Sequence, residues 1–376
     1  MFLRAIALFL IYYNSMKRIL LFVAILLIAL PSLVHAQSGL GENTGFDTEP
    51  TTQEVRATIT AVTTDELNDG QRHVVFEAKS SDGVEFTIDS ANSFTAGIFI
   101  DLHEGQKVLL QTITYPDGTS DAFYVDIVRT NTLLWIFLLF ALVTILIGTL
   151  RGALALVGLL VTVAILFGFI IPQIAGGSDP VITTVLGGIV ILAVNMHLTH
   201  GLNRKTFMAF IGTVIGLGLV VIFSEAFVYF AGLSGMASEE SALLFLTSES
   251  IMIPSGVLLA GIILGAVGVL DDIAVTQVET VTEIKAADPS LTNRDLFTRA
   301  MRVGRHHIAS VVNTLVLAYA GVALPLFLLF YITPDMDILR FVNEELIAEE
   351  IIRTIAGTMG LVLLVPIATW LAIYPS

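Results

Sequence analysis

Two hydrophobic patterns divide this chain of 376 residues. Up to about Val128, apolar and polar residues alternate along five short runs, and from Leu133 onward long apolar runs replace them. Alternation with a period of two predicts β-strands with one buried face, and apolar runs of about 20 residues predict membrane-spanning helices. The pattern therefore predicts an α-helical polytopic membrane protein with a small β domain before its spans.

The alternating runs predict five strands, beginning with Val55, Ala57 and Ile59 on one face and continuing at 73–78, 84–88, 107–113 and 123–128. Turn residues separate these runs. Residues 91–101 lack alternation, and we expect one short helix there. Five strands with a helix after the third is the order of an OB-type barrel, so residues 53–130 are predicted to be OB-like. The side chains expected to point inward are those of Val55, Ile59, Phe76, Phe86, Ile88, Val108, Leu110, Val125 and Ile127.

The apolar runs predict seven transmembrane helices within residues 133–372, at 133–150, 152–171, 181–197, 207–231, 251–270, 308–332 and 352–372. Backbone groups inside a bilayer must be hydrogen-bonded within the segment, so these runs are helical. Basic residues, including Arg151, Arg204 and Lys285, gather in the connections after the first, third and fifth spans, while the other connections are acidic. The positive-inside rule places the basic connections in the cytoplasm, the β domain outside and the C-terminus inside.

The N-terminus predicts export. After Met16, a basic pair, a short apolar stretch and small residues before Gln37 resemble a signal peptide, so the true start is expected at Met16. An uncleaved signal anchor within residues 1–36 is the alternative. Residues 37–52 are rich in Gly, Thr and acids and predict a flexible tether.

Composition narrows the function. The sequence is 55% hydrophobic with a mean hydropathy of +0.86, as a chain embedded in a lipid bilayer requires. The exported domain is acidic, which argues against nucleic acid as a partner. There are no cysteines, so disulfides, thiolate metal sites and cysteine nucleophiles are excluded. No nucleophile with a nearby base, phosphate loop or cofactor motif appears, so we expect neither an enzyme nor a cofactor.

Polar residues within the spans are the candidate site, because ionisable groups are costly in a bilayer. The fifth run continues past Asp271 and Asp272, and Asp272, Thr276, Glu279 and Glu283 fall on one helical face. One interpretation is an interfacial hairpin in which Glu279 and Glu283 pair with Arg299 and Arg302 and provide rigidity. The other is that Asp271 or Asp272 binds a proton or cation, preferably Asp271. The candidate neighbours of that site are Asn195, His197, His306 and Asn313. Histidine spacing does not match a metal site.

The helix around Gly261 carries a family resemblance. The segment from Gly261 to Gln277, Gly- and Ala-rich and ending in Asp271-Asp272 before Ile273-Ala274, resembles the YibE/F-like membrane proteins of bacteria, as does the order of signal, β domain and spans. The doublet departs from the single aspartate expected, so which residue corresponds is open. The resemblance implies a bacterial plasma-membrane location and adds no substrate.

Two functions follow from different classes. The first is a permease that moves an ion or small solute past Asp271 and Asp272. The second is a non-transporting anchor or scaffold in which the exported β domain binds an envelope protein partner. The sequence does not give the substrate or the oligomeric state.

Overall fold

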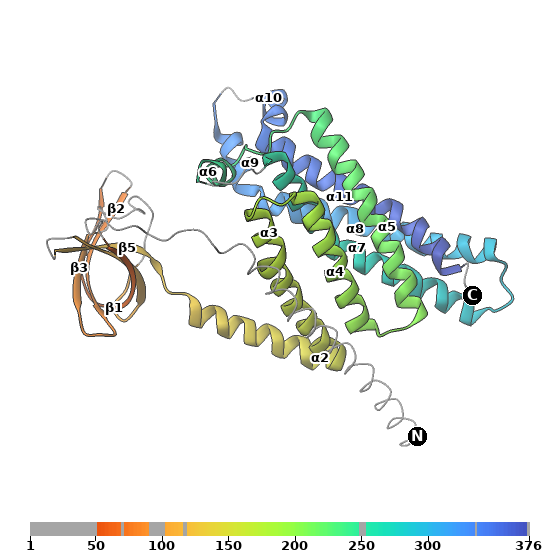
Figure 1. Ribbon diagram of the computed structural model, residues 1–376, viewed down its shortest axis with the longest axis horizontal. Helices are drawn as coiled ribbons and strands as arrows, with labels where there is room; N and C mark the ends of the chain where they lie inside the picture. The colour runs from red at the N-terminus through yellow and green to blue at the C-terminus, as the bar shows by residue number, and fades with distance from the viewer. Residues whose placement is uncertain are drawn as a thin grey trace, which may run out of the picture. The chain divides into compact units, whose positions relative to one another are not determined.

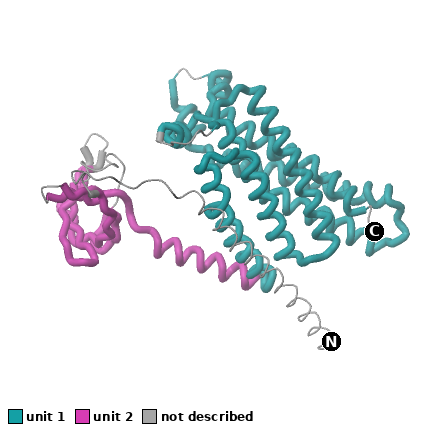
Figure 2. Tube along the Cα trace, viewed as in Figure 1, with its two compact units in different colours: residues 1–39, 148–376 teal, residues 40–147 magenta. Residues whose placement is uncertain are grey.

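The computed structural model describes residues 51–68, 71–89, 102–115, 119–247, 253–334 and 337–373. The chain forms two compact units, one of residues 40–147 that contains the sheet, and one of residues 1–39 and 148–376 that contains the helical bundle (Figure 2). The predicted signal, nearly all of the tether and the helix expected at 91–101 lie outside the described residues.

Five antiparallel strands form the sheet, in the order β3-β2-β1-β4-β5 (Figure 1). The bounds are β1 Thr51–Asn68, β2 Gln71–Ser80, β3 Glu85–Asp89, β4 Lys107–Thr114 and β5 Ser120–Ile127. The long β1 pairs with β4 through its first half and with β2 through its second half. Two register shifts in β1, between Ile59 and Ala61 and between Val62 and Thr64, mark bulges that bend the strand. The sheet therefore curls into a half-barrel.

The interior of the half-barrel largely follows the predicted alternation. Five predicted core residues are buried, namely Ile59, Phe76, Ile88, Val108 and Leu110, and Phe86 and Ile127 pack partly buried against them. Val55 is half-buried. The prediction for Val125 is wrong, because Tyr124 is buried in its place and meets the Phe76 ring edge-on, with ring centroids 6.1 Å apart. A bulge opposite Leu109 and Leu110 shifts β5 by one residue, which exchanges its two faces.

The rest of the chain is helical. The helices are α2 Thr130–Ile165, the π-helix η2 Leu166–Ile170, α3 Ile171–Ala175, α4 Pro180–His200, α5 Arg204–Ala231, α6 Glu239–Thr247, α7 Pro254–Ala287, α8 Asn293–Val322, α9 Leu324–Ile332, α10 Ile338–Asn343 and α11 Glu345–Ile373. Within the described residues, five helical runs are long and apolar enough to cross a membrane, or six if α8 and α9, bent by 62°, form one span.

The first two predicted spans belong to one apolar run, Thr130–Ala175, of 46 residues. This run is broken at Thr149, whose φ of 54° and ψ of −135° lie outside the helical region. The break lies beside the predicted boundary at Arg151. Three other helices are longer than predicted. Helix α7 continues to Ala287 instead of ending near residue 270, and α8 and α11 begin before the predicted residues 308 and 352.

Close approaches at glycines give the relative directions of α4 and α7. A methyl group added at Gly256 of α7 would lie 3.3 Å from Pro180 of α4, and one added at Gly188 of α4 would lie 3.0 Å from Val267 of α7. The two contacts progress along both helices in the same sense, so α4 and α7 are parallel.

Helices α5 and α11 run in opposite directions. Gly212 of α5 packs on Ala368 of α11, and Gly360 of α11 packs tightly on Val220 of α5. Helix α7 is parallel to α11, because Gly261 approaches Arg353 toward the N-terminal ends of both and Gln277 donates to Thr369 toward their C-terminal ends. Such alternation of direction is what successive membrane crossings require.

Candidate functional site

One continuous exposed face runs along α7, although α7 is otherwise the most buried of the five long helices. Buried residues alternate with this face along the whole helix, so it occurs every three to four positions. We call it the α7 stripe; its residues are Gly261, Gly265, Gly268, Asp272, Thr276, Glu279 and Glu283, of which all but the half-buried Gly261 are exposed. Glycines form its N-terminal half, and acidic and hydroxyl side chains form its C-terminal half.

The C-terminal half of the stripe opens into a polar cavity of about 570 Å³. Its walls come from α2, α4, α7 and α8, with Arg151, Thr199, His200, Val275, Thr276, Glu279, Thr280, Glu283, Ile284 and Val303 as lining residues. His200 lies within electrostatic range of Arg151, Glu279 and Asp272. The acidic and hydroxyl face expected from the spacing of Thr276, Glu279 and Glu283 therefore lines one cavity.

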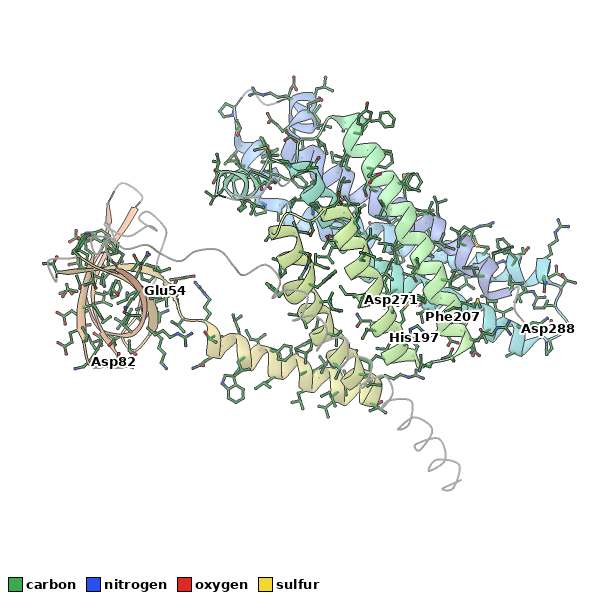
Figure 3. All side chains as sticks on the ribbon, in the orientation of Figure 1. Glu54, Asp82, His197, Phe207, Asp271 and Asp288 are labelled. Carbon is green, nitrogen blue, oxygen red and sulfur yellow. The ribbon has the colours of Figure 1, made fainter. Side chains whose placement is uncertain are left out.

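Asp271, labelled in Figure 3, lies halfway along α7 and precedes the stripe residue Asp272. Its Oδ1 atom is buried and receives no hydrogen bond from any described residue. Asp272, the next residue, is exposed on the stripe. Consecutive residues on a helix are about 100° apart, so the two carboxylates face different surroundings. A buried acceptor without a donor is costly unless it takes up a proton, a cation or water.

Asn195 lies near the C-terminal end of α4 and faces α2 instead of Asp271. Its Nδ2 atom donates to the Thr162 hydroxyl over 3.0 Å, and its Oδ1 atom is buried without a hydrogen bond. A methyl group added at Gly158 would lie 2.8 Å from that oxygen, so α2 approaches closely at this point. Asn195 thus contributes a second unpartnered acceptor to the same end of the bundle, from a different helix.

No hydrogen bond or ion pair between described residues joins the remaining predicted neighbours to Asp271. His197 is half-buried, hydrogen-bonds through Nδ1 to the Ala193 carbonyl over 2.7 Å and lies edge-on to Phe210 of α5. His306 and Asn313 are exposed on α8. No hydrogen bond between described residues joins Asp271 to Asn195 or Asn313.

The predicted ion pairing between the acidic face of α7 and the basic face of α8 is wrong for Glu279. Its Oε2 atom lies 3.2 Å from Nζ of Lys205 on α5. Arg299 and Arg302 are exposed, and among the described residues neither forms an ion pair with Glu279 or Glu283. The reason is geometric, because the stripe faces the cavity while α8 presents its small residues, such as Gly304, to α7.

A second polar cluster, which the sequence interpretation missed, lies at the glycine half of the stripe. The Arg353 Nη1 atom of α11 lies 3.3 Å from a methyl group added at Gly261. The Tyr319 hydroxyl of α8 lies 3.0 Å from one added at Gly265. Arg353 Nε is 3.5 Å from Oε1 of Glu350, and the Tyr319 hydroxyl is within electrostatic range of both charges.

Two sequence features bear on this cluster. Arg353 falls just inside the predicted last span at 352–372 and lies within α11, which begins at Glu345. Glycines four residues apart, such as Gly261 and Gly265, are typical of close helix packing, whereas here the missing side chains admit two polar groups from other helices. Gln277 was also missed; it is buried and donates to Thr369 Oγ1 over 2.7 Å and to the Ala300 carbonyl over 3.3 Å.

Comparison with known proteins gives a family for the helical part. Neither the curated proteins nor the solved structures include a match to this chain. The family described as YibE/F-like protein matches residues 136–374, which cover the bundle and the whole α7 stripe but not the sheet. The chain therefore belongs to the YibE/F-like family of proteins.

Proposed function

We propose that the protein is a membrane permease that moves a proton, cation or small cationic solute along the α7 stripe. The observation that carries this proposal is the exposed Asp272 between glycines and the polar cavity, on a helix most of whose other positions are buried or half-buried. A carboxylate facing lipid at this depth costs about 2.5 kcal/mol or more, so the stripe needs water or a ligand.

Asp271 is the binding residue in this proposal, and Asp272 guides the ion from the cavity. The unpartnered Oδ1 atoms of Asp271 and Asn195 are acceptors, which suits a proton or cation and not an anion. Glu279 and Glu283 add negative charge to the cavity wall, opposed there by Arg151. The electrostatic balance of the path is acidic and favours cations.

The proposed membrane arrangement has seven crossings in the bacterial plasma membrane. The run broken at Thr149 supplies two of them, and α4, α5, α7, the bent pair α8–α9 and α11 supply the others. The positive-inside rule places the cavity on the cytoplasmic side and the β domain outside. The strand order β3-β2-β1-β4-β5, with β3 and β5 approaching one another, supports an OB-type barrel.

The test is flux of protons and of monovalent cations into reconstituted vesicles. Native protein should exceed empty vesicles, Asp271→Asn should abolish the excess, and Asp272→Asn should lower it about tenfold. Asp288→Asn is the matched control, since Asp288 follows α7 outside the stripe and asparagine can still accept the hydrogen bonds from Ser290. Native flux equal to that of empty vesicles would favour the anchor function, in which the β domain binds an envelope protein and no chemistry or transport occurs.

A further inference from the structure

We infer that Tyr319 and Arg353 close the α7 stripe at its glycine end, so that the stripe is open only toward the polar cavity. The inference rests on the proposed function, because a closure has a role only if the stripe is a transport path, but its evidence comes from other residues. Gly261 lies 11 positions before Asp272 on the same face, which is roughly 16 Å along a helix. The closing residues and the acidic residues are therefore separate layers of one path.

Gly261 and Gly265 act as sockets, because each lacks a side chain and leaves space for a polar group from another helix. Tyr319 comes from α8 and Arg353 from α11, and both end on the stripe, over Gly265 and Gly261. A methyl group added at either position would lie 3.0 Å from the tyrosine hydroxyl or 3.3 Å from the guanidinium, closer than side chains normally approach. Gly268, the next stripe residue, has nothing within 4 Å of an added methyl group. Polar side chains thus lie over the stripe at Gly261 and at Gly265, which keeps exposed surface, and nothing lies over it at Gly268.

The charges at the closure suit a barrier to cations. The guanidinium of Arg353 places a positive charge across the path, and the Glu350 carboxylate holds it from the same helix. The pair is loosely made, because Nε to Oε1 is 3.5 Å and the buried Nε has no hydrogen bond within the described residues. The Glu349 side chain, 8% exposed, also has an unpartnered Oε1 atom beside this pair. Loose pairing allows the arginine to leave its socket without breaking an optimal bond.

A cavity of about 270 Å³ lies beside the closure and gives the Tyr319 side chain somewhere to move. Its walls come from α8, α9 and α11 and include Tyr319, Phe327, Glu350 and Thr354. Opening would move Tyr319 toward this space and uncover Gly265. Tyr319 and Arg353 are positioning residues in this scheme, since they control access and bind no substrate.

The experiment uses the full cysteine-free chain with one reporter, Thr276→Cys, which lines the polar cavity. An impermeant thiol reagent is applied to intact cells, or to inverted membranes to reach the cavity side. We expect labelling from the cavity side in every variant and little labelling from the other side with native Tyr319 and Arg353. Arg353→Gln should raise labelling from the closed side about tenfold, a change corresponding to 1.4 kcal/mol.

Glycine substitutions separate closure from general damage. Gly265→Ala should raise closed-side labelling more than Gly261→Ala, and adding Tyr319→Phe should lower labelling in the Gly265→Ala variant, because the hydroxyl in conflict is gone. Gly357→Ala is the control, one turn beyond Arg353 with nothing within 4 Å. Cavity-side labelling without any closed-side rise in Arg353→Gln and Gly265→Ala overturns the closure and leaves the proposed function standing. Absence of labelling from both sides overturns the water-accessible stripe, and with it the proposed function.

Discussion

The β half-barrel and the helical bundle differ in whether their buried polar side-chain atoms are hydrogen-bonded. Within the described residues, every buried side-chain polar atom without a hydrogen bond belongs to the bundle, at Thr184, Asn195, Ser224, Asp271, Glu349 and Arg353. Buried polar side chains in the sheet are paired, as Thr112 shows by donating to the Gln53 carbonyl over 3.2 Å. Unpartnered buried groups are expensive and tend to persist where function uses them.

The two regions therefore differ in their buried polar side chains: the described part of the sheet hydrogen-bonds them, and the bundle leaves polar atoms of six residues unpartnered. The family match agrees with this division, because it begins at residue 136, after the last strand. The family match thus covers the helical bundle and not the sheet, and the following predictions test whether the two regions are independent.

The largest effect is expected from a substitution that destabilises the sheet and leaves the helical bundle unchanged. Phe76 is fully buried at the centre of the half-barrel, so Phe76→Ala should lower its free energy of unfolding by about 3–5 kcal/mol. Proteolysis of residues 51–129 in the full chain measures this, while thiol labelling of Thr276→Cys should stay unchanged. Val84→Ala, at a residue 52% exposed, is the control. Loss of labelling together with the sheet would show that the two regions are coupled.

Within the bundle, the strongest packing effect should come from Gly360. An added methyl group there would overlap Val220 of α5, so Gly360→Ala should cost about 1–3 kcal/mol through forced shifts of the α5–α11 contact. Gly357→Ala, three residues earlier on the same helix, meets nothing within 4 Å and should be neutral. Thermal unfolding in detergent compares the two variants. Equal midpoints would show that the bundle is looser than its glycine contacts indicate.

A smaller effect is expected from Gln277, a buried polar residue of the bundle that is hydrogen-bonded to two other helices. Gln277→Leu removes its bonds to Thr369 and to the Ala300 carbonyl and should cost about 1 kcal/mol. Adding Thr369→Val removes the other partner and should cost less than the sum of the two single changes. Strict additivity of the unfolding free energies would mean that the two side chains do not interact.

Sequence patterns predicted what depends on local periodicity. Five strands, five of nine inward residues and the long helices followed from alternation and apolar length. Tyr124 replaced Val125 because a bulge opposite Leu109 and Leu110 depends on strand pairing, which alternation alone does not contain. Thr149 shows the same limit, since the break in the first apolar run depends on backbone angles and not on composition.

The candidate site was predictable only in part, for a related reason. The spacing of Thr276, Glu279 and Glu283 placed them on one face because a helix fixes that geometry within one segment. The partners of that face come from other helices, and the sequence offered Arg299 and Arg302 where the structure brings Lys205 and Arg151. Tyr319 reaches the stripe from α8 and Arg353 reaches it from α11. These contacts depend on how the helices pack together, which no single-helix pattern contains.

The smallest effect concerns the Tyr124 phenol in the sheet, whose loss of a proton lowers stability at alkaline pH and has no effect at neutral pH. Burial raises the pKa of the Tyr124 phenol to about 12, above the ordinary value of 10.0. The unfolded chain therefore loses this proton first, so the stability that Tyr124 contributes is complete below pH 10 and is lost as the pH rises toward 12. A fragment of residues 51–129 should show mainly β-type circular dichroism at pH 7 and unfold progressively over that window. Tyr124→Phe keeps the ring that meets Phe76 but has no proton to lose, so its stability should fall less between pH 10 and 12. Tyr115→Phe removes a phenol that is 36% exposed and should follow the native fragment. If Tyr124→Phe and the native fragment lose stability in parallel, the Tyr124 phenol is not desolvated as its burial implies. A mainly helical spectrum at pH 7 would instead show that the half-barrel does not form without the helical bundle.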